Sequence, residues 1–159
     1  MVWIGLTRML AVTLVTALFV SDTWAEGALP TSRGSYSAAL KYEQQAAAAI
    51  EKRSLSRLRA IEEDLANLAR KATRRFIDGA QQGKNTVDQC DTAIIGLVSI
   101  VSAAITELEN SESRQARATV SAMLENGHKY RRNMRACESI LGVRPAAHPD
   151  LVSAVQAQR

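Results

Sequence analysis

Residues 87–108, VDQCDTAIIGLVSIVSAAITEL, and residues 116–141, ARATVSAMLENGHKYRRNMRACESIL, each carry apolar side chains at steps of three and four. The first stripe is Val87, Cys90, Ile94, Leu97, Val101, Ile105 and Leu108, and the second is Ala116, Val120, Met123, Gly127, Tyr130, Met134, Cys137 and Leu141. This spacing predicts two amphipathic helices. The stretch between them, Asn110 to Arg114, is rich in residues that favour turns and caps.

Folding the chain back around residue 114 brings the two stripes face to face and sets Cys90 opposite Cys137. The same register sets Leu97 opposite Tyr130 and Val101 opposite Gly127. One continuous helix would instead hold the two cysteines about 70 Å apart, too far for a bond within one chain. We therefore predict an antiparallel helical hairpin with a Cys90–Cys137 disulfide near its open end.

A further helix is expected before this hairpin, because Ser35 to Asp78 contains no Gly or Pro and is dominated by helix-forming residues. Its later part carries an a/d stripe typical of coiled-coil packing, formed by Leu58, Ile61, Leu65, Leu68 and Ala72. Gly79 to Asn85 reads as a loop. A turn there lets only about Leu55 to Phe76 lie along the second helix, so Ser35 to Ser54 must overhang the bundle or bend back over it.

The predicted fold class is all-α: an antiparallel three-helix bundle with an overlong first helix and one interhelical disulfide. The expected organisation is a signal peptide (1–25), a flexible lead (26–34), the bundle (35–142) and a Pro-containing tail (143–159). The second helix is expected to start at Thr86 in a capping box. The tail contains a short amphipathic helical piece, Asp150 to Gln158.

Residues 1–25 have the layout of a secretory signal. Arg8 precedes the apolar run Met9 to Val20, and Thr23-Trp24-Ala25 supplies small residues for cleavage after Ala25. The run covers about 18 Å as a helix, against about 30 Å for the hydrocarbon core of a membrane. The expected location is periplasmic or secreted, where a disulfide is stable, and the alternative is an uncleaved N-terminal anchor.

No motif for catalysis or cofactor binding is visible. The chain lacks a nucleophile elbow, a phosphate-binding Gly loop, a His-Glu-x-x-His site and a Cys-x-x-Cys-His haem site. Met123 and Met134 are interpreted as core residues, and His128 and His148 as surface residues. We expect no enzyme, no cofactor and no metal.

Two functions remain as hypotheses. In the first, the protein is a non-enzymatic interaction or adaptor module of a bacterial envelope. It would contact a protein partner through the overhanging part of the first helix, at Tyr36, Leu40, Tyr42 and Ile50. Self-association through the first helix is an alternative use of the same residues.

In the second hypothesis the protein binds polyanions such as lipid headgroups, lipopolysaccharide phosphates or nucleic acid. The formal net charge is +4, and the hairpin register gathers many bases towards one end of the bundle. The predicted anion-binding residues are Arg70, Lys71, Arg74, Arg75, Lys129, Arg131, Arg132 and Arg135. The competing explanation is that bases near helix C-termini complement the helix dipole, at about 0.3–1 kcal/mol each.

Overall fold

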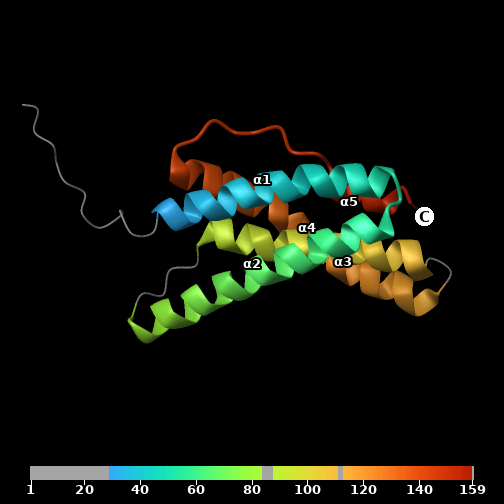
Figure 1. Cartoon of the computed structure of the whole chain (residues 1–159), viewed down its shortest axis with the longest axis horizontal. Helices are drawn as coiled ribbons and strands as arrows, with labels where there is room; N and C mark the ends of the chain where they lie inside the picture. The colour runs from blue at the N-terminus through green and yellow to red at the C-terminus, as the bar shows by residue number, and fades with distance from the viewer. Residues whose placement is uncertain (1–28, 84–87, 111–112, 159) are drawn as a thin grey trace, which may run out of the picture.

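The computed structural model describes residues 29–83, 88–110 and 113–158, which form five α-helices and no strand (Figure 1). The helices are α1 (Leu29–Glu51), α2 (Leu55–Gln81), α3 (Gln89–Asn110), α4 (Arg114–Leu141) and α5 (Leu151–Gln156). The all-α class and the Cys90–Cys137 disulfide are confirmed. The predicted signal peptide and the expected helix start at Thr86 lie outside the described residues.

The single long helix expected over Ser35–Asp78 is wrong, because the chain turns at Lys52–Ser54 and α1 folds back along α2 (Figure 1). Of the two alternatives for Ser35–Ser54, an overhang or a segment that bends back over the bundle, the structure has the second. Arg53 adopts a positive φ of 50° and donates its N–H to the Ile50 carbonyl at 3.0 Å. A left-handed conformation costs a non-Gly residue about 1–2 kcal/mol. Burial outweighs this cost, since the turn places Ile50 in the same core as Leu58.

α3 forms the centre of the molecule, α1 covers one side of it, and α2 and α4 flank it (Figure 1). Within the described chain α1 and α3 each contact all the other helices, whereas α2 and α4 do not contact each other. By length and composition α3 could cross a membrane, and 61% of its most apolar window is buried inside the fold. Such burial is what the central helix of a bundle requires.

The α3–α4 hairpin forms with the disulfide across its open end, where the two cysteine Cα atoms are 4.9 Å apart. Glycines permit close approach of the two helices. A Cβ at Gly96 would lie 3.1 Å from the Tyr130 Cβ, and one at Gly127 would lie 2.5 Å from the Ile100 Cγ1. The observed pairs, Gly96 with Tyr130 and Ile100 with Gly127, therefore differ from the predicted register by one residue.

Side-chain caps fix where several helices begin. The N–H of Cys90 donates to Asp88 Oδ1 at 2.8 Å, so Asp88 caps α3. Ser113 caps α4 in the same way, and Asp150 caps α5 by accepting from the Ser153 N–H at 3.2 Å. α5 buries its apolar residues against α1, α3 and α4, so the tail covers part of the bundle. α1 already begins at Leu29, inside the segment expected to be a flexible lead.

Candidate functional site

A buried charged cluster joins the tail to α1 and α4. His148 Nδ1 lies 2.7 Å from Glu43 Oε2, and His148 Nε2 lies 3.1 Å from Glu138 Oε1. The His148 side chain is 2% exposed, and the two carboxylates are 0% and 1% exposed. The expectation that His148 is a surface residue is therefore wrong, because docking of the tail places its ring between two buried acids.

Glu138 is well supplied with hydrogen-bond donors. It accepts from the Ala146 N–H at 2.7 Å, from Arg135 Nη1 at 3.0 Å and from the Tyr36 hydroxyl at 3.3 Å. Burial alone would raise the pKa of Glu138, but the Ala146 N–H, His148 and Arg135 outweigh burial and lower that pKa. Glu138 is thus held as a carboxylate.

Glu43 is less well supplied. Burial raises the pKa of Glu43, and the neighbouring His148 opposes that shift only in part. Burial, followed by the charge of Glu43, also raises the pKa of the Tyr130 hydroxyl. The Tyr130 hydroxyl acts on Glu43 as a hydrogen-bonding neighbour that lowers the pKa of that carboxyl, but neither Glu43 Oε1 nor this hydroxyl is in a hydrogen bond of normal geometry among the described residues. The cluster is therefore only partly satisfied, which adds a desolvation cost on the Glu43 side.

This cluster has no open position for a reactant. Each ring nitrogen of His148 already faces a carboxylate, and the three side chains are closed to solvent. Across the part of the chain that the structure describes, no group of three or more His, Cys, Asp or Glu side chains is arranged to hold a metal ion. Glu43, His148 and Glu138 therefore form a clamp, which fixes the tail to α1 and α4.

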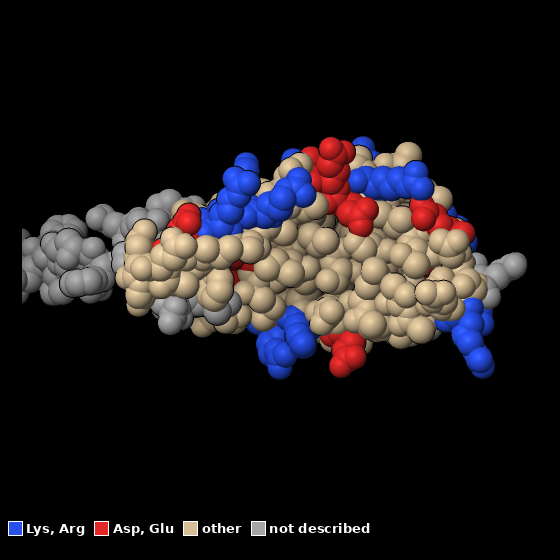
Figure 2. Space-filling view, turned by 90° about the horizontal axis from the view of Figure 1, so that it is seen from below, with Lys and Arg blue, Asp and Glu red and all other residues tan. Residues whose placement is uncertain are grey.

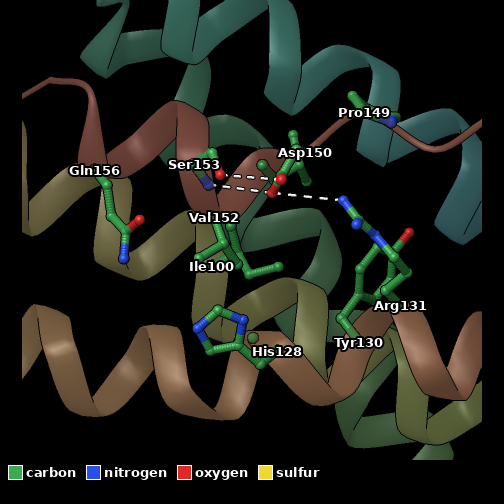
Figure 3. A pocket seen from close by; sticks show the side chains of 11 residues that line it. Ile100, His128, Tyr130, Arg131, Pro149, Asp150, Val152, Ser153 and Gln156 are labelled. Atoms are coloured by element: carbon green, nitrogen blue, oxygen red, sulfur yellow. Dashed lines mark hydrogen bonds and ion pairs between the residues drawn. The ribbon is translucent and has the colours of Figure 1, made fainter.

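A small pocket lies beside this clamp, between α4 and the start of α5 (Figure 3). Arg131 forms an ion pair with Asp150 at 3.4 Å, and Asp150 also accepts from the Ser153 hydroxyl at 3.0 Å. His128 contributes to the lining from an exposed position on α4, as expected for a surface histidine. The cavity volume is about 160 Å³, whereas small-molecule sites usually have about 300–1,000 Å³.

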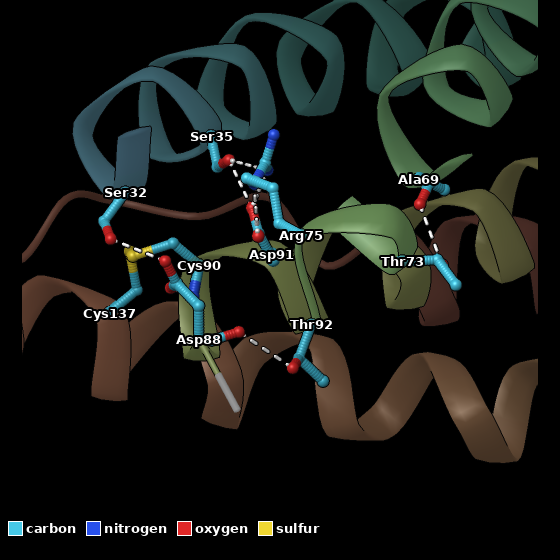
Figure 4. Close-up of polar contacts among 10 residues, drawn as sticks. All are labelled: Ser32, Ser35, Ala69, Thr73, Arg75, Asp88, Cys90, Asp91, Thr92 and Cys137. Carbon is cyan, nitrogen blue, oxygen red and sulfur yellow. Dashed lines mark hydrogen bonds and ion pairs between the residues drawn. A yellow bond between two sulfur atoms is a disulfide. The ribbon is translucent and has the colours of Figure 1, made fainter. Parts of the chain in front are cut away.

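Three of the predicted anion-binding residues are used inside the fold. Arg75 pairs with Asp91 at 2.5 Å close to the disulfide (Figure 4). Arg131 pairs with Asp150, and Arg135 pairs with Glu138. The other five are exposed and form no ion pair within the described residues: Arg70, Lys71 and Arg74 on α2, and Lys129 and Arg132 on α4. Because α2 and α4 do not contact each other, the structure brings these bases together only in part.

The predicted partner-binding residues lie between α1 and the rest of the bundle. Ile50 is fully buried, and Tyr36, Leu40 and Tyr42 are partly buried against the core. The Tyr42 hydroxyl donates to Asp64 of α2 at 3.0 Å. These four residues hold α1 against the bundle, so they do not form the free overhanging surface expected for them.

An open groove lies between α2 and α3 on the side of α3 away from α1. Its lining consists of Ala66, Ala69, Arg70, Thr73, Arg74, Ile95 and Val98. The groove has a volume of about 490 Å³. Figure 2 shows the face of the molecule opposite α1, where uncharged side chains form a broad band and charged ones lie mostly along its edges.

Large apolar side chains are exposed along this groove and just beyond it. Ile95 is 46% exposed, and Phe76 and Ile77 are each 48% exposed. One feature of the sequence indicated this surface: Ile95 and Val98 are apolar but lie outside the predicted core stripe of their helix. That signal does not reveal which helices flank them, so sequence reasoning missed the groove.

The disulfide is compatible with an oxidising, exported environment. No family model, no curated protein and no solved structure matches the chain. The cluster of Glu43, His148 and Glu138 is closed to solvent, whereas the α2–α3 groove is open. The groove is therefore the better candidate for a binding site.

Proposed function

We propose that this protein is an exported, non-enzymatic interaction module of a bacterial envelope that docks a protein partner in the α2–α3 groove. The observation that carries this proposal is Ile95, a large apolar side chain that stays 46% exposed on the central helix. The export step is supported by the signal-like residues 1–25 and by the disulfide. The partner surface thus moves from α1, where sequence reasoning placed it, to the opposite face.

The distribution of exposed apolar residues supports the groove. In the described part of the chain the exposed large apolar residues are Phe76, Ile77, Ile95 and Ile140. The first two lie in the last turns of α2, and Ile95 lines the groove on α3. Contiguous exposed apolar surface marks interaction sites on proteins, and a groove between two helices is a common seat for a partner helix.

A non-enzymatic role is supported by the buried cluster. A general acid or base must come within hydrogen-bond distance of its substrate. His148 and both carboxylates are at most 2% exposed and bond to one another. The residues with the strongest chemistry are therefore occupied in holding the tail.

Polyanion binding is the second candidate, and the unpaired bases favour it. Arg70, Lys71 and Arg74 lie close together on α2, and no carboxylate pairs with them among the described residues. Affinity for a polyanion falls steeply as salt concentration rises. Docking that is driven mainly by apolar contacts depends much less on salt.

Site-specific photo-crosslinking separates the two candidates. A photoreactive residue in place of Ile95 should form a protein adduct in envelope extract at low and at high salt. The matched control is the same residue in place of Ile140, which is 56% exposed on α4. Equal labelling at both positions contradicts the groove. Binding to heparin or anionic vesicles that disappears with salt, without an adduct at position 95, favours the second candidate.

A further inference from the structure

We infer that the occupant of the α2–α3 groove is an amphipathic helix that carries acidic residues beside its apolar stripe. This inference rests on the proposed function and specifies the partner. It combines three observations: an apolar floor with small side chains, two guanidinium groups without a carboxylate, and a length that suits a short helix.

The apolar lining of the groove suits a helix. Ala66 and Ala69 form one wall, and Ile95 and Val98 of α3 form the other. Small alanine side chains let a second helix approach α2 closely, and packed helices lie about 8–10 Å apart. The exposed Ile95 would then be buried by the apolar stripe of the partner.

The rim of the groove carries unpaired positive charge. Arg70 and Arg74 both line it, and among the described residues the Arg70 guanidinium hydrogen-bonds only to Asn67 of its own helix. Arg74 makes no hydrogen bond or ion pair within the described residues. The nearby Asp91 is no alternative partner, because it already binds Arg75.

Two like charges four residues apart destabilise a helix by a few tenths of a kcal/mol. Arg70 and Arg74 stand in this relation. A carboxylate on a docked helix would remove the repulsion and form charge-assisted hydrogen bonds with both guanidinium groups. The charge of the rim therefore favours an acidic partner.

Contacts at one end of the α2–α3 seam define the length of the groove. Arg59 pairs with Glu109, and the Ser102 hydroxyl donates to Glu62, so this end is closed. Open surface runs from Ala66 to Thr73 and one turn further to the exposed Ile77. From Ala66 to Ile77 a helix rises about 17 Å, which fits about three turns of a docked helix.

Other occupants fit less well. A second copy docked groove to groove about a two-fold axis would place four guanidinium groups, two Arg70 and two Arg74, in one interface. Nucleic acid or a sugar phosphate would satisfy these arginines and would leave Ile95 and Val98 without an apolar partner.

The test uses the purified chain and two synthetic helical peptides of about 14 residues, labelled with fluorescein. Both carry the same leucine stripe, flanked by Glu in one peptide and by Lys in the other. Fluorescence anisotropy should show at least tenfold tighter binding of the acidic peptide. The Arg70→Glu/Arg74→Glu variant should reverse this preference, and Ile95→Asp should abolish binding of both peptides.

The matched control is Arg57→Glu/Arg132→Glu, which changes the net charge equally at exposed positions outside the groove. It should leave both affinities unchanged, and circular dichroism should confirm that each variant is folded. Equal binding of both peptides that Ile95→Asp abolishes overturns the acidic partner and leaves the proposed function standing.

Two further results would overturn the inference. If neither peptide binds, the helical occupant is wrong, and crosslinking at position 95 separately decides the proposed function. A dimer in light scattering that Ile95→Asp dissociates would identify a second copy as the occupant.

Discussion

The two sides of α3 differ in whether charged side chains find partners inside the fold. On the side that α1 covers, Glu43 and Glu138 are buried and both face His148, and Asp91 binds Arg75. On the opposite side an apolar groove stays open between α2 and α3. The arginines on its rim have no carboxylate among the described residues. The covered side therefore pairs most of its charged groups internally, whereas the groove leaves both apolar surface and charge for a partner.

This difference predicts that substitutions on the covered side cost stability and that groove substitutions cost binding. The largest effect is expected for Cys137→Ala. The disulfide closes a 47-residue separation, which corresponds to about 4 kcal/mol of chain entropy, less any strain. Denaturant unfolding should show this loss with a mostly helical far-ultraviolet spectrum. Two free thiols in the non-reduced wild-type protein would contradict the bond.

The second effect is expected for His148→Ala, which leaves two buried carboxylates facing each other without the ring. Removing one partner of a buried hydrogen bond costs about 1–3 kcal/mol, and more when the group left behind is charged. We expect about 3 kcal/mol, because Glu138 keeps its bonds to Arg135 and to the Ala146 N–H. The control is His128→Ala, an exposed histidine that should change the free energy of unfolding by less than about 0.5 kcal/mol. Similar values for both variants would show that the clamp does not hold the tail.

The third effect is expected for Gly127→Leu. A Cβ at Gly127 would lie 2.5 Å from Ile100 Cγ1 and 3.6 Å from the Val152 side chain of α5. Overpacking of this kind costs about 1–3 kcal/mol. Gly34→Ala is the control, since nothing lies within 4 Å of a Cβ there, and it should stabilise α1 by about 0.5–1 kcal/mol. A stabilised Gly127→Leu variant would show that α3 and α4 are not in close contact at this point.

The hairpin and the disulfide could be predicted from the sequence, because apolar steps of three and four define a helix face and the turn fixes which residues meet. The break before α2 could not, because Arg53 takes a conformation that normally favours Gly. Its stabilisation comes from burial of Ile50 in a core built by later parts of the chain.

The clamp and the groove could not be predicted either, because both form only through contacts between distant parts of the chain. Glu43, Glu138 and His148 come from three separate parts of the chain, and nothing in their local sequences marks them as neighbours. Ile95 was visible as an apolar residue outside the stripe. Its exposure follows from the placement of α2 and α4 around α3, which composition and spacing do not specify.

A pH dependence should distinguish the two carboxylates of the clamp. Burial raises the pKa of Glu43, so the folded state binds more protons there and loses stability as pH rises above about 4.5. The pKa of Glu138 is lowered, so its contribution is present above about 4.5 and is lost as pH falls. Relative to wild type, Glu43→Gln should gain stability with rising pH and Glu138→Gln should lose it. Unfolding at pH 4 to 7 measures both trends, and trends of the same sign would contradict this assignment.

The smallest effect is expected for Tyr130→Phe, and it tests how complete the clamp is. The Tyr130 hydroxyl is buried beside Glu43 and is not in a hydrogen bond of normal geometry among the described residues. Removing a buried polar group without a partner costs nothing and can stabilise by up to about 1 kcal/mol. Tyr36→Phe is the control, because the Tyr36 hydroxyl donates to Glu138 at 3.3 Å, and its loss should cost about 0.5–1.5 kcal/mol. If Tyr130→Phe costs more than Tyr36→Phe, the Tyr130 hydroxyl bonds to the free oxygen of Glu43. The covered side would then have all its polar groups satisfied, and its contrast with the groove would be sharper.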